Sequence, residues 1–203
     1  RRVIGVVAIV GLAFGASAGT QIKLKKATIN TEIRQPNRFP IDHNSAGHFI
    51  IQFADTIQQS DKDLIAKSGL KVLRYVPDDS YIVTGSGKSI EELLINKKIS
   101  AALEYKSEYK LSEYIPKGSI FNGNSNFDFT VTVFEQQKTK HVQNLISKIR
   151  GAMVRESAGR TIVVSLDLKD IKKISQIQGI EWIEPFQAMQ LHVLPVDSSD
   201  QVR

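Results

Sequence analysis

Hydrophobic and polar positions repeat along the chain in two similar blocks. Phe49-Ile-Ile-Gln-Phe53 has the alternation of a half-buried strand, and so has Phe129-Thr-Val-Thr-Val-Phe134. A short amphipathic helix pattern follows each strand and ends at a glycine, at Gly69 in the first block and at Gly151 in the second. We therefore predict that each block begins with a strand and a helix.

A hairpin of two strands and a second helix follow in both blocks. In the first block the hairpin spans 71–83 around Pro77-Asp78-Asp79, because proline followed by aspartate is a tight-turn signal. The corresponding stretch of the second block is 152–166. The remaining predicted elements, two helices and two closing strands, are Ser89 to about Lys97, Leu168 to about Gln178, Ile99–Glu104 and Ile180–Glu184.

The two blocks keep a nearly constant distance along the chain. Phe53 and Phe134 are 81 residues apart, and Gly69 and Gly151 are 82 residues apart. A repeated order β-α-β-β-α-β is typical of the ferredoxin-like split βαβ fold. We therefore expect an α+β protein with two tandem ferredoxin-like domains, each an antiparallel sheet with both helices on one face.

The N-terminus has the pattern of a secretory signal peptide. Arg1-Arg2 precedes an uncharged run from Val3 to Gly15, and Ala16-Ser17-Ala18 matches a cleavage site. The apolar run is shorter than the roughly 20 residues that a membrane span needs. We expect a bacterial protein that is cleaved after Ala18, is secreted or periplasmic, and has no membrane contact after cleavage.

The remaining sequence is divided by changes in composition. Residues 19–47 are polar with little periodicity and predict a solvated leader, in which a lysine cluster at 23–26 is available to an acidic surface. The expected organisation is a signal peptide over 1–18, the leader over 19–47, the first domain over 48–105, a linker over 106–126, the second domain over 127–191 and a C-terminal tail over 192–203.

Composition excludes several classes of protein. The 203 residues contain no cysteine, which excludes a disulfide scaffold, a thiolate zinc site and a cysteine nucleophile. The net charge of +6 falls to +4 if both N-terminal arginines are removed. The strand Ser80-Tyr-Ile-Val-Thr-Gly85 does not have the pattern of an RNA-recognition strand, and its counterpart in the second block has no aromatic residue. We expect no nucleic acid partner.

One segment suggests a phosphate-binding loop. Gly85-Ser-Gly-Lys-Ser89 lies between a predicted strand and a predicted helix, but the position where the Walker pattern requires glycine is Ile82. Ser89 and Glu92 have the spacing of a capping box, in which the two residues satisfy free amides at the start of a helix. We therefore interpret this segment as a helix cap.

No other residues form a recognisable catalytic or metal-binding arrangement. Asp42-His43 and His48 lack a third ligand at a usable spacing. Asp78-Asp79 is explained by turn chemistry, and no serine has a histidine and an acid arranged around it. We expect a chain without catalytic activity, metal or cofactor.

Two segments resemble a known family. Phe49–Phe53 and Gly69–Val83 are similar to the N-terminal region of large secreted subtilisin-like serine proteases. The second block, with Gly151–Val154 and Gly179-Ile-Glu-Trp-Ile-Glu-Pro185, resembles the propeptide or inhibitor-type domain that precedes their catalytic domain. The likeness covers about residues 48–191 as a set of short motifs. It implies an intramolecular chaperone and temporary inhibitor whose partner, in cis or in trans, is a subtilisin-like catalytic domain.

The resemblance also implies that the tail after the last strand binds substrate-like in the protease cleft. The matching positions are Pro185, Phe186, Gln190, Leu191 and Leu194. An extended tail suits this role because it pairs with an active-site edge by strand addition. The family's catalytic residues have no counterparts in the 203 residues, so we expect either a fragment of a longer precursor or a free-standing protein.

Two other functions stay open because a fold does not determine a function. One is a non-catalytic, exported binding or adhesion module of the cell surface or periplasm. The other is a small-ligand regulatory domain, which tandem split βαβ units also permit, although no Gly/Asp-rich interface loop is present.

Overall fold

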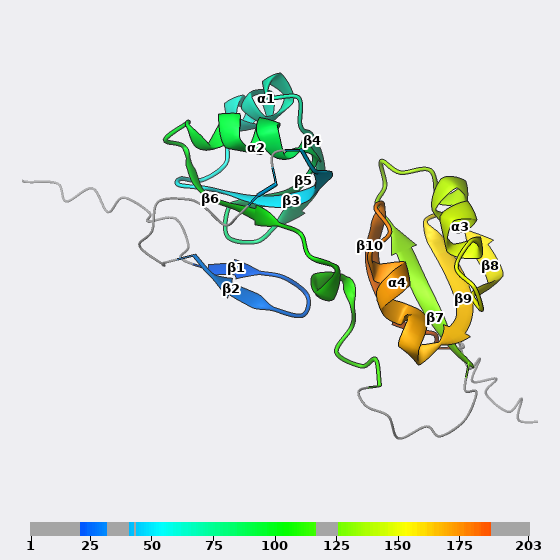
Figure 1. The fold of residues 1–203 in the computed structure, drawn as a ribbon. Coiled ribbons are helices and arrows are strands. Elements are labelled where there is room, and N and C mark those ends of the chain that lie inside the picture. The colour runs from blue at the N-terminus through cyan, green and yellow to red at the C-terminus, as the bar shows by residue number, and fades with distance from the viewer. Residues whose placement is uncertain (1–20, 32–40, 43, 117–125, 188–203) are drawn as a thin grey trace, which may run out of the picture.

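The computed structural model describes residues 21–31, 41–42, 44–116 and 126–187. These residues form two four-stranded antiparallel sheets with helices and one small two-stranded sheet, which confirms the α+β class (Figure 1). The expected signal peptide lies outside the described residues. None of the helices in the described parts is long and apolar enough to cross a membrane.

The first unit, residues 46–104, has its elements in the predicted order. They are β3 (Ala46–Phe53), α1 (Gln59–Lys67), β4 (Lys71–Val76), β5 (Ser80–Ser86), α2 (Gly87–Leu94) and β6 (Ile99–Glu104). The strands lie in the order β4-β5-β3-β6, and every neighbouring pair is antiparallel. Asp78 and Asp79 have positive φ angles of 64° and 49°, which explains why short polar residues occupy this turn.

The second unit, residues 126–185, repeats this arrangement. Its elements are β7 (Asn126–Val133), α3 (Thr139–Ser147), β8 (Met153–Ala158), β9 (Thr161–Asp167), the 3₁₀ turn η2 (Leu168–Asp170), α4 (Ile171–Ser175) and β10 (Ile180–Pro185). Read in the same direction as the first sheet, the strand order is β8-β9-β7-β10. The strands β8, β9, β7 and β10 therefore occupy the positions of β4, β5, β3 and β6. The helix predicted over 168–178 is divided into η2 and the shorter α4.

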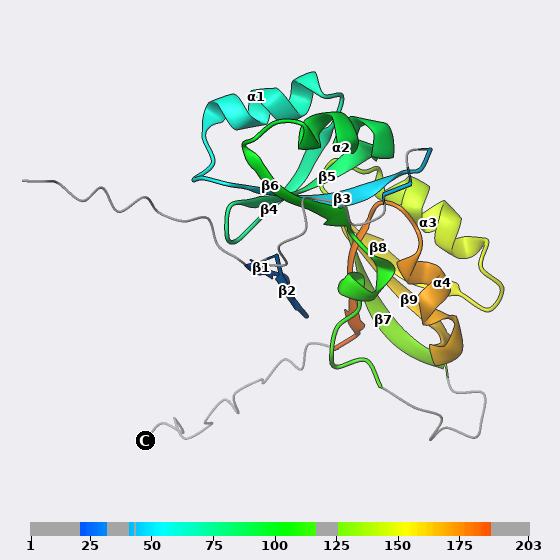
Figure 2. The same cartoon turned by 60° about the vertical axis from the view of Figure 1, so that its left-hand side comes forward.

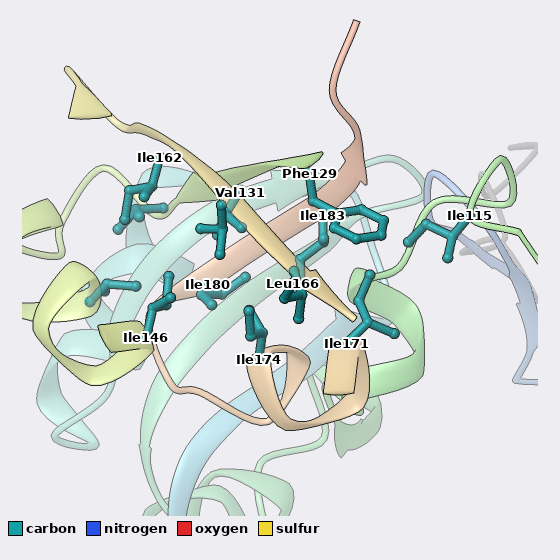
Figure 3. Close-up of a cluster of buried hydrophobic side chains, with 13 residues drawn as sticks. Ile115, Phe129, Val131, Ile146, Ile162, Leu166, Ile171, Ile174, Ile180 and Ile183 are labelled. Atoms are coloured by element: carbon teal, nitrogen blue, oxygen red, sulfur yellow. The ribbon is translucent and has the colours of Figure 1, made fainter. Parts of the chain in front are cut away.

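The core of the second unit lies between its sheet and its two helices. Figure 3 shows side chains of β7 and β10, among them Val131 and Ile180, in one cluster with Ile146 of α3 and Ile174 of α4. Residues that alternate with the core positions of β7, such as Thr130, are partly exposed. The prediction of a half-buried strand is therefore confirmed for β7.

The sheet of the first unit is buried on both faces, unlike the half-buried strand predicted at 49–53. Phe49 and Ile51 of β3 pack with α1 and α2, whereas Ile50 packs on the opposite face with Ile22 and with Phe134 of the second unit. Every residue from 48 to 53 is buried. The prediction was wrong because distant segments cover the second face, and local alternation does not report them.

One of these covering segments is a small hairpin, β1 (Gln21–Lys23) and β2 (Thr28–Asn30), which lies on the side of the first sheet opposite α1 and α2 (Figures 1 and 2). The amide of Gln52, which is fully buried, donates to the carbonyl oxygens of Gln21 and Asp78 at 3.2 and 3.1 Å and accepts from Thr31 at 2.8 Å. Ile22 is fully buried too. The described part of the leader therefore packs against the first sheet, and the prediction of a solvated segment was wrong there.

The chain between the units also packs against the protein rather than forming a solvated linker. After β6, the 3₁₀ turn η1 (Ser107–Lys110) leads to Leu111, which forms a parallel bridge with Ile183 of β10. The amide of Ser112 donates to the carbonyl oxygen of Ile183 at 2.8 Å, and Ile115 is buried in the core of the second unit. Residues 105–116, called the connection below, thus extend the sheet of the second unit.

Candidate functional site

The start of the expected protease-contacting tail continues directly from β10. Pro185 pairs with Phe129, and the amide of Phe186 donates to the carbonyl oxygen of Asp128 at 2.9 Å. The side chain of Phe186 is 38% exposed. Gln190, Leu191 and Leu194 lie outside the described residues. The described part of the tail therefore leaves the sheet as an extended chain with an exposed aromatic side chain.

The sheet of the second unit presents one face without a helix beside this tail. Thr130 pairs with Glu184 of β10 on one side and with Val163 of β9 on the other, and Val163 pairs with Glu156 of β8. Asp128 lies two residues before Thr130 on the same face. We call these residues the open face. Its three carboxylates are exposed, and the exposed Arg155 stands beside Glu156 at the irregularity in the pairing of β8 with β9. Three acids and one base leave the surface net negative, which suits a partner with positive groups.

A buried ion cluster joins the two units. The carboxylate of Glu181, which is 5% exposed, pairs with Arg74 of β4 in the first unit and with Arg160 of its own unit at 3.4 Å. Glu181 lies at an irregularity in the pairing of β10 with β7, so its side chain leaves the regular alternation of the strand. The hydroxyl of Tyr105 donates to the Glu181 carbonyl oxygen at 3.2 Å, and burial raises the pKa of that tyrosine to about 12.

Trp182 lies next to this cluster and contacts the hairpin. Its indole N–H donates to Glu184 at 3.0 Å, and the ammonium group of Lys25 lies 4.9 Å from the ring centroid, within the range of a cation–π contact. Lys23 pairs with Asp78 at 3.6 Å. These two cations of the leader therefore contact their own chain.

The segment that suggests a phosphate loop is a helix cap, but one that differs from the predicted cap. Ser86 is the N-cap residue of α2, and its hydroxyl accepts from the amide of Ser89 at 3.1 Å. Glu92 pairs instead with Lys88 at 3.9 Å. The amide of Gly87 donates to the carbonyl oxygen of Ser45, so the start of this helix is already covered by the chain's own backbone.

Several polar and charged residues lie at the junction, by which we mean the contacts between the two units, and no sequence motif predicts their positions. Glu181 stands out only as an acid inside an apolar strand, and Arg74 as a base in another. His48 and Lys110 are 5% and 4% exposed, and no motif in the sequence indicates their burial. No group of three His, Asp or Glu side chains that would hold a metal ion occurs in the described parts of the chain.

Comparison with known proteins shows similarity in the N-terminal part. A family described as a domain of unknown function (DUF8729) matches residues 19–106, less than half of the chain. No curated protein and no solved structure matches. The matched segment contains the hairpin together with the whole first unit and ends before η1, so the family includes the hairpin as the structure does. The second unit lies outside the match.

Proposed function

We propose that the two units are tandem ferredoxin-like domains and that they form the propeptide-like chaperone and inhibitor region of an exported, subtilisin-like serine protease. The strand orders β4-β5-β3-β6 and β8-β9-β7-β10 correspond strand by strand, which supports a duplicated domain. The resemblance of Gly179–Pro185 to the family's closing motif supports the partner. The chain itself is not catalytic under this proposal.

The observation that carries the proposal is the position of the open face beside the outgoing tail. The open face offers a net negative sheet surface, and β10 continues from it through Pro185 into Phe186. A protease that binds the open face would therefore receive the tail as an extended strand. Main-chain hydrogen bonds would provide affinity, and alternate side chains would fill the subsites.

The two roles follow from the same contact. A partner that binds the folded protease domain and not its unfolded form stabilises the fold by mass action, which is the chaperone role. The tail occupies the substrate cleft at the same time, which is the inhibitory role. Among the described residues, Ile22 and Phe134 cover the helix-free face of the first sheet, whereas the carboxylates of the open face stay exposed. We therefore assign the contact to the second unit.

Inhibition assays test the proposal. A protein of residues 19–203 should inhibit several subtilisin-like proteases, whereas a protein of residues 19–185 should inhibit them weakly because the tail is absent. Phe186→Ala should weaken inhibition, and Tyr114→Ala, a matched control at an exposed aromatic residue of the connection, should not. Absence of inhibition by residues 19–203 across these proteases would contradict the proposal.

Charge reversal tests the open face separately. Glu156→Lys should weaken the complex, because the substitution reverses one of three negative charges at the expected contact. Glu108→Lys on the connection is the control, since Glu108 is exposed and is not one of the residues of the open face. Equal inhibition by both variants would argue against binding through the open face.

The alternative function is an exported, non-catalytic binding or adhesion module. The exposed Phe186 next to the open face favours this function as well, because both suit a protein or glycan surface that is not a protease. Pull-down from the native secretome distinguishes the two functions. A recovered protease supports the first, and a recovered surface protein or glycan supports the second.

A further inference from the structure

A polar cavity of about 300 Å³ lies where the two units meet. The first unit contributes the start of β3 and the end of β6, the connection contributes η1, and the second unit contributes the end of α4. This volume is at the lower end of the range of small-molecule sites, about 300–1,000 Å³. The cavity is separate from the open face and from the tail.

Hydrogen bonds between distant segments border the cavity. The side-chain amide of Gln178 donates to the carbonyl oxygen of Ala46 at 2.6 Å, which links the second unit to the first. The ammonium group of Lys110 donates to the carbonyl oxygen of Ile177 at 3.2 Å, which links the connection to the end of α4. A molecule bound here would therefore touch both units.

Two opposite charges line the cavity without pairing with each other. Lys110 is 4% exposed and uses one of its three N–H groups, while Glu104 is exposed at the end of β6. Within the described residues, neither side chain has an ion pair. Burial lowers the pKa of Lys110 to about 8 although the charge of Glu104 opposes this change, so the lysine is mostly protonated at neutral pH.

A neutral histidine completes the polar lining. His48 is 5% exposed, and its ring lies edge-on to the ring of Phe134, with the two ring centroids 5.2 Å apart. Its ring nitrogens have no hydrogen-bond partner among the described residues. Burial, and to a smaller degree the charge of Lys110, lowers the pKa of His48 to about 4. At neutral pH the imidazole therefore offers one N–H donor and one acceptor nitrogen.

We propose that this cavity binds a free α-amino acid or a similarly small zwitterion. Its carboxylate accepts hydrogen bonds from the unused N–H groups of Lys110 and from the imidazole of His48, and its ammonium group pairs with Glu104. Each charge of the ligand thus meets an opposite charge or a donor that the protein leaves unused. The ligand contacts both units and therefore stabilises the arrangement in which they meet.

Other small ligands fit the lining less well. An apolar ligand would remove water from Lys110 without replacing its hydrogen bonds, which is costly for a buried charge. A phosphate ion would place two negative charges close to Glu104. A zwitterion matches the lining because the cavity holds one positive and one negative side chain.

Thermal unfolding and calorimetric titration of residues 19–203 test this proposal. Free amino acids should raise the unfolding temperature and give measurable binding. The amide of the best-binding amino acid lacks the carboxylate and should bind at least about tenfold more weakly, since a charge-assisted hydrogen bond is lost. The N-acetyl form, which lacks the ammonium group, should also bind more weakly. Absence of binding by every amino acid, or equal binding of the three forms, would overturn the proposal.

Variants connect binding to the cavity. Glu104→Gln lies at an exposed position and should reduce the preference for the free over the N-acetylated amino acid. Lys110→Met should weaken binding about tenfold or more, and Lys106→Met, an exposed lysine of the connection, should leave it unchanged. Unchanged binding by Glu104→Gln and by a folded Lys110→Met would place the ligand elsewhere and overturn the assignment. These readouts need no protease, so they are independent of the proposed inhibitory function.

Discussion

The guanidinium group of Arg74 on β4 pairs with the buried carboxylate of Glu181 on β10, so one ion pair joins the two units. Arg74 is partly exposed, whereas the side chain of Glu181 is 7% exposed. The carboxylate therefore depends on its partners more than the guanidinium does. Loss of Arg74 leaves Glu181 with Arg160 alone.

We expect Arg74→Met to destabilise the protein by about 1–3 kcal/mol. The value is below that of a fully buried pair because Arg74 reaches solvent and Arg160 remains. Urea unfolding measures the change. Lys88→Met, which breaks an exposed pair with Glu92 on α2, is the matched control and should change stability much less. Similar losses for the two variants would contradict a stabilising role of the junction pair.

The hairpin should be removable from the first sheet without unfolding the sheets. Ile22→Ala deletes the fully buried side chain of the hairpin, and the hydrogen bonds of Gln52 with Gln21 and Thr31 are too few to hold the hairpin in place. Trp182 is the single tryptophan and contacts Lys25 next to the hairpin. Its fluorescence should shift to longer wavelength as water reaches the ring, with far-ultraviolet circular dichroism nearly unchanged.

The control for this experiment is Ile95→Ala, since Ile95 is 83% exposed on the first unit. This variant should leave the emission of Trp182 unchanged. A cooperative loss of both fluorescence and circular dichroism signals in Ile22→Ala would show instead that the hairpin is part of the folding core.

His48 should make stability fall in mild acid. Its pKa in the folded protein is about 4, below the ordinary value of 6.5, so the unfolded chain takes up this proton first as the pH falls. The free energy of unfolding should decrease between about pH 6.5 and pH 4, by a total of about 3 kcal/mol. Unfolding in urea across this range measures the slope.

His48→Gln should remove this contribution from the slope, whatever its effect on absolute stability. His141→Gln, on an exposed position of α3, should retain it. An unchanged slope in His48→Gln would mean that another group causes the acid sensitivity.

Two glycines should respond to alanine for different reasons. A Cβ at Gly87 would overlap the carbonyl oxygen of Asp42, so Gly87→Ala must displace the segment that covers the start of α2, at about 1–3 kcal/mol. Gly151 has φ +86° with open space around it, so Gly151→Ala should cost about 1 kcal/mol through backbone strain alone. Thermal unfolding of the two variants compares their losses of stability. A larger loss at Gly151 would contradict this explanation.

The order of helices and strands was predictable because it depends on local periodicity. The closing strand at Ile99–Glu104 was predicted with the bounds that the structure has, and the helix predicted before Gly151 is confirmed as α3. The shift of the α2 cap from Ser89 to Ser86 has a local cause. Both serines lie next to glycine or lysine in a segment without apolar periodicity, so the sequence does not indicate which one precedes the first helical turn.

The junction was not predictable because its contacts join residues far apart in sequence. Ile22 is one apolar residue between polar neighbours, and its burial depends on β3 and on Phe134. The cavity residues were not predictable for the same reason. Lys110 resembles any lysine of a polar linker until η1 places it against the end of α4. For the predicted tail, the structure describes Pro185 and Phe186 and adds no test of a protease contact.

The parallel bridge of Leu111 with Ile183 makes the two repeats unequal as independent folding units. β10 is an edge strand, and its outer backbone groups are partly occupied by the connection rather than by the repeat itself. A protein cut at the start of β7 would expose this edge and lose the side chain of Ile115 from the core. Exposed edges pair with other chains, so such a fragment should self-associate, whereas one beginning near Ser107 should remain monomeric. The stretch of chain that packs on the second unit therefore begins about twenty residues before the first strand of that unit.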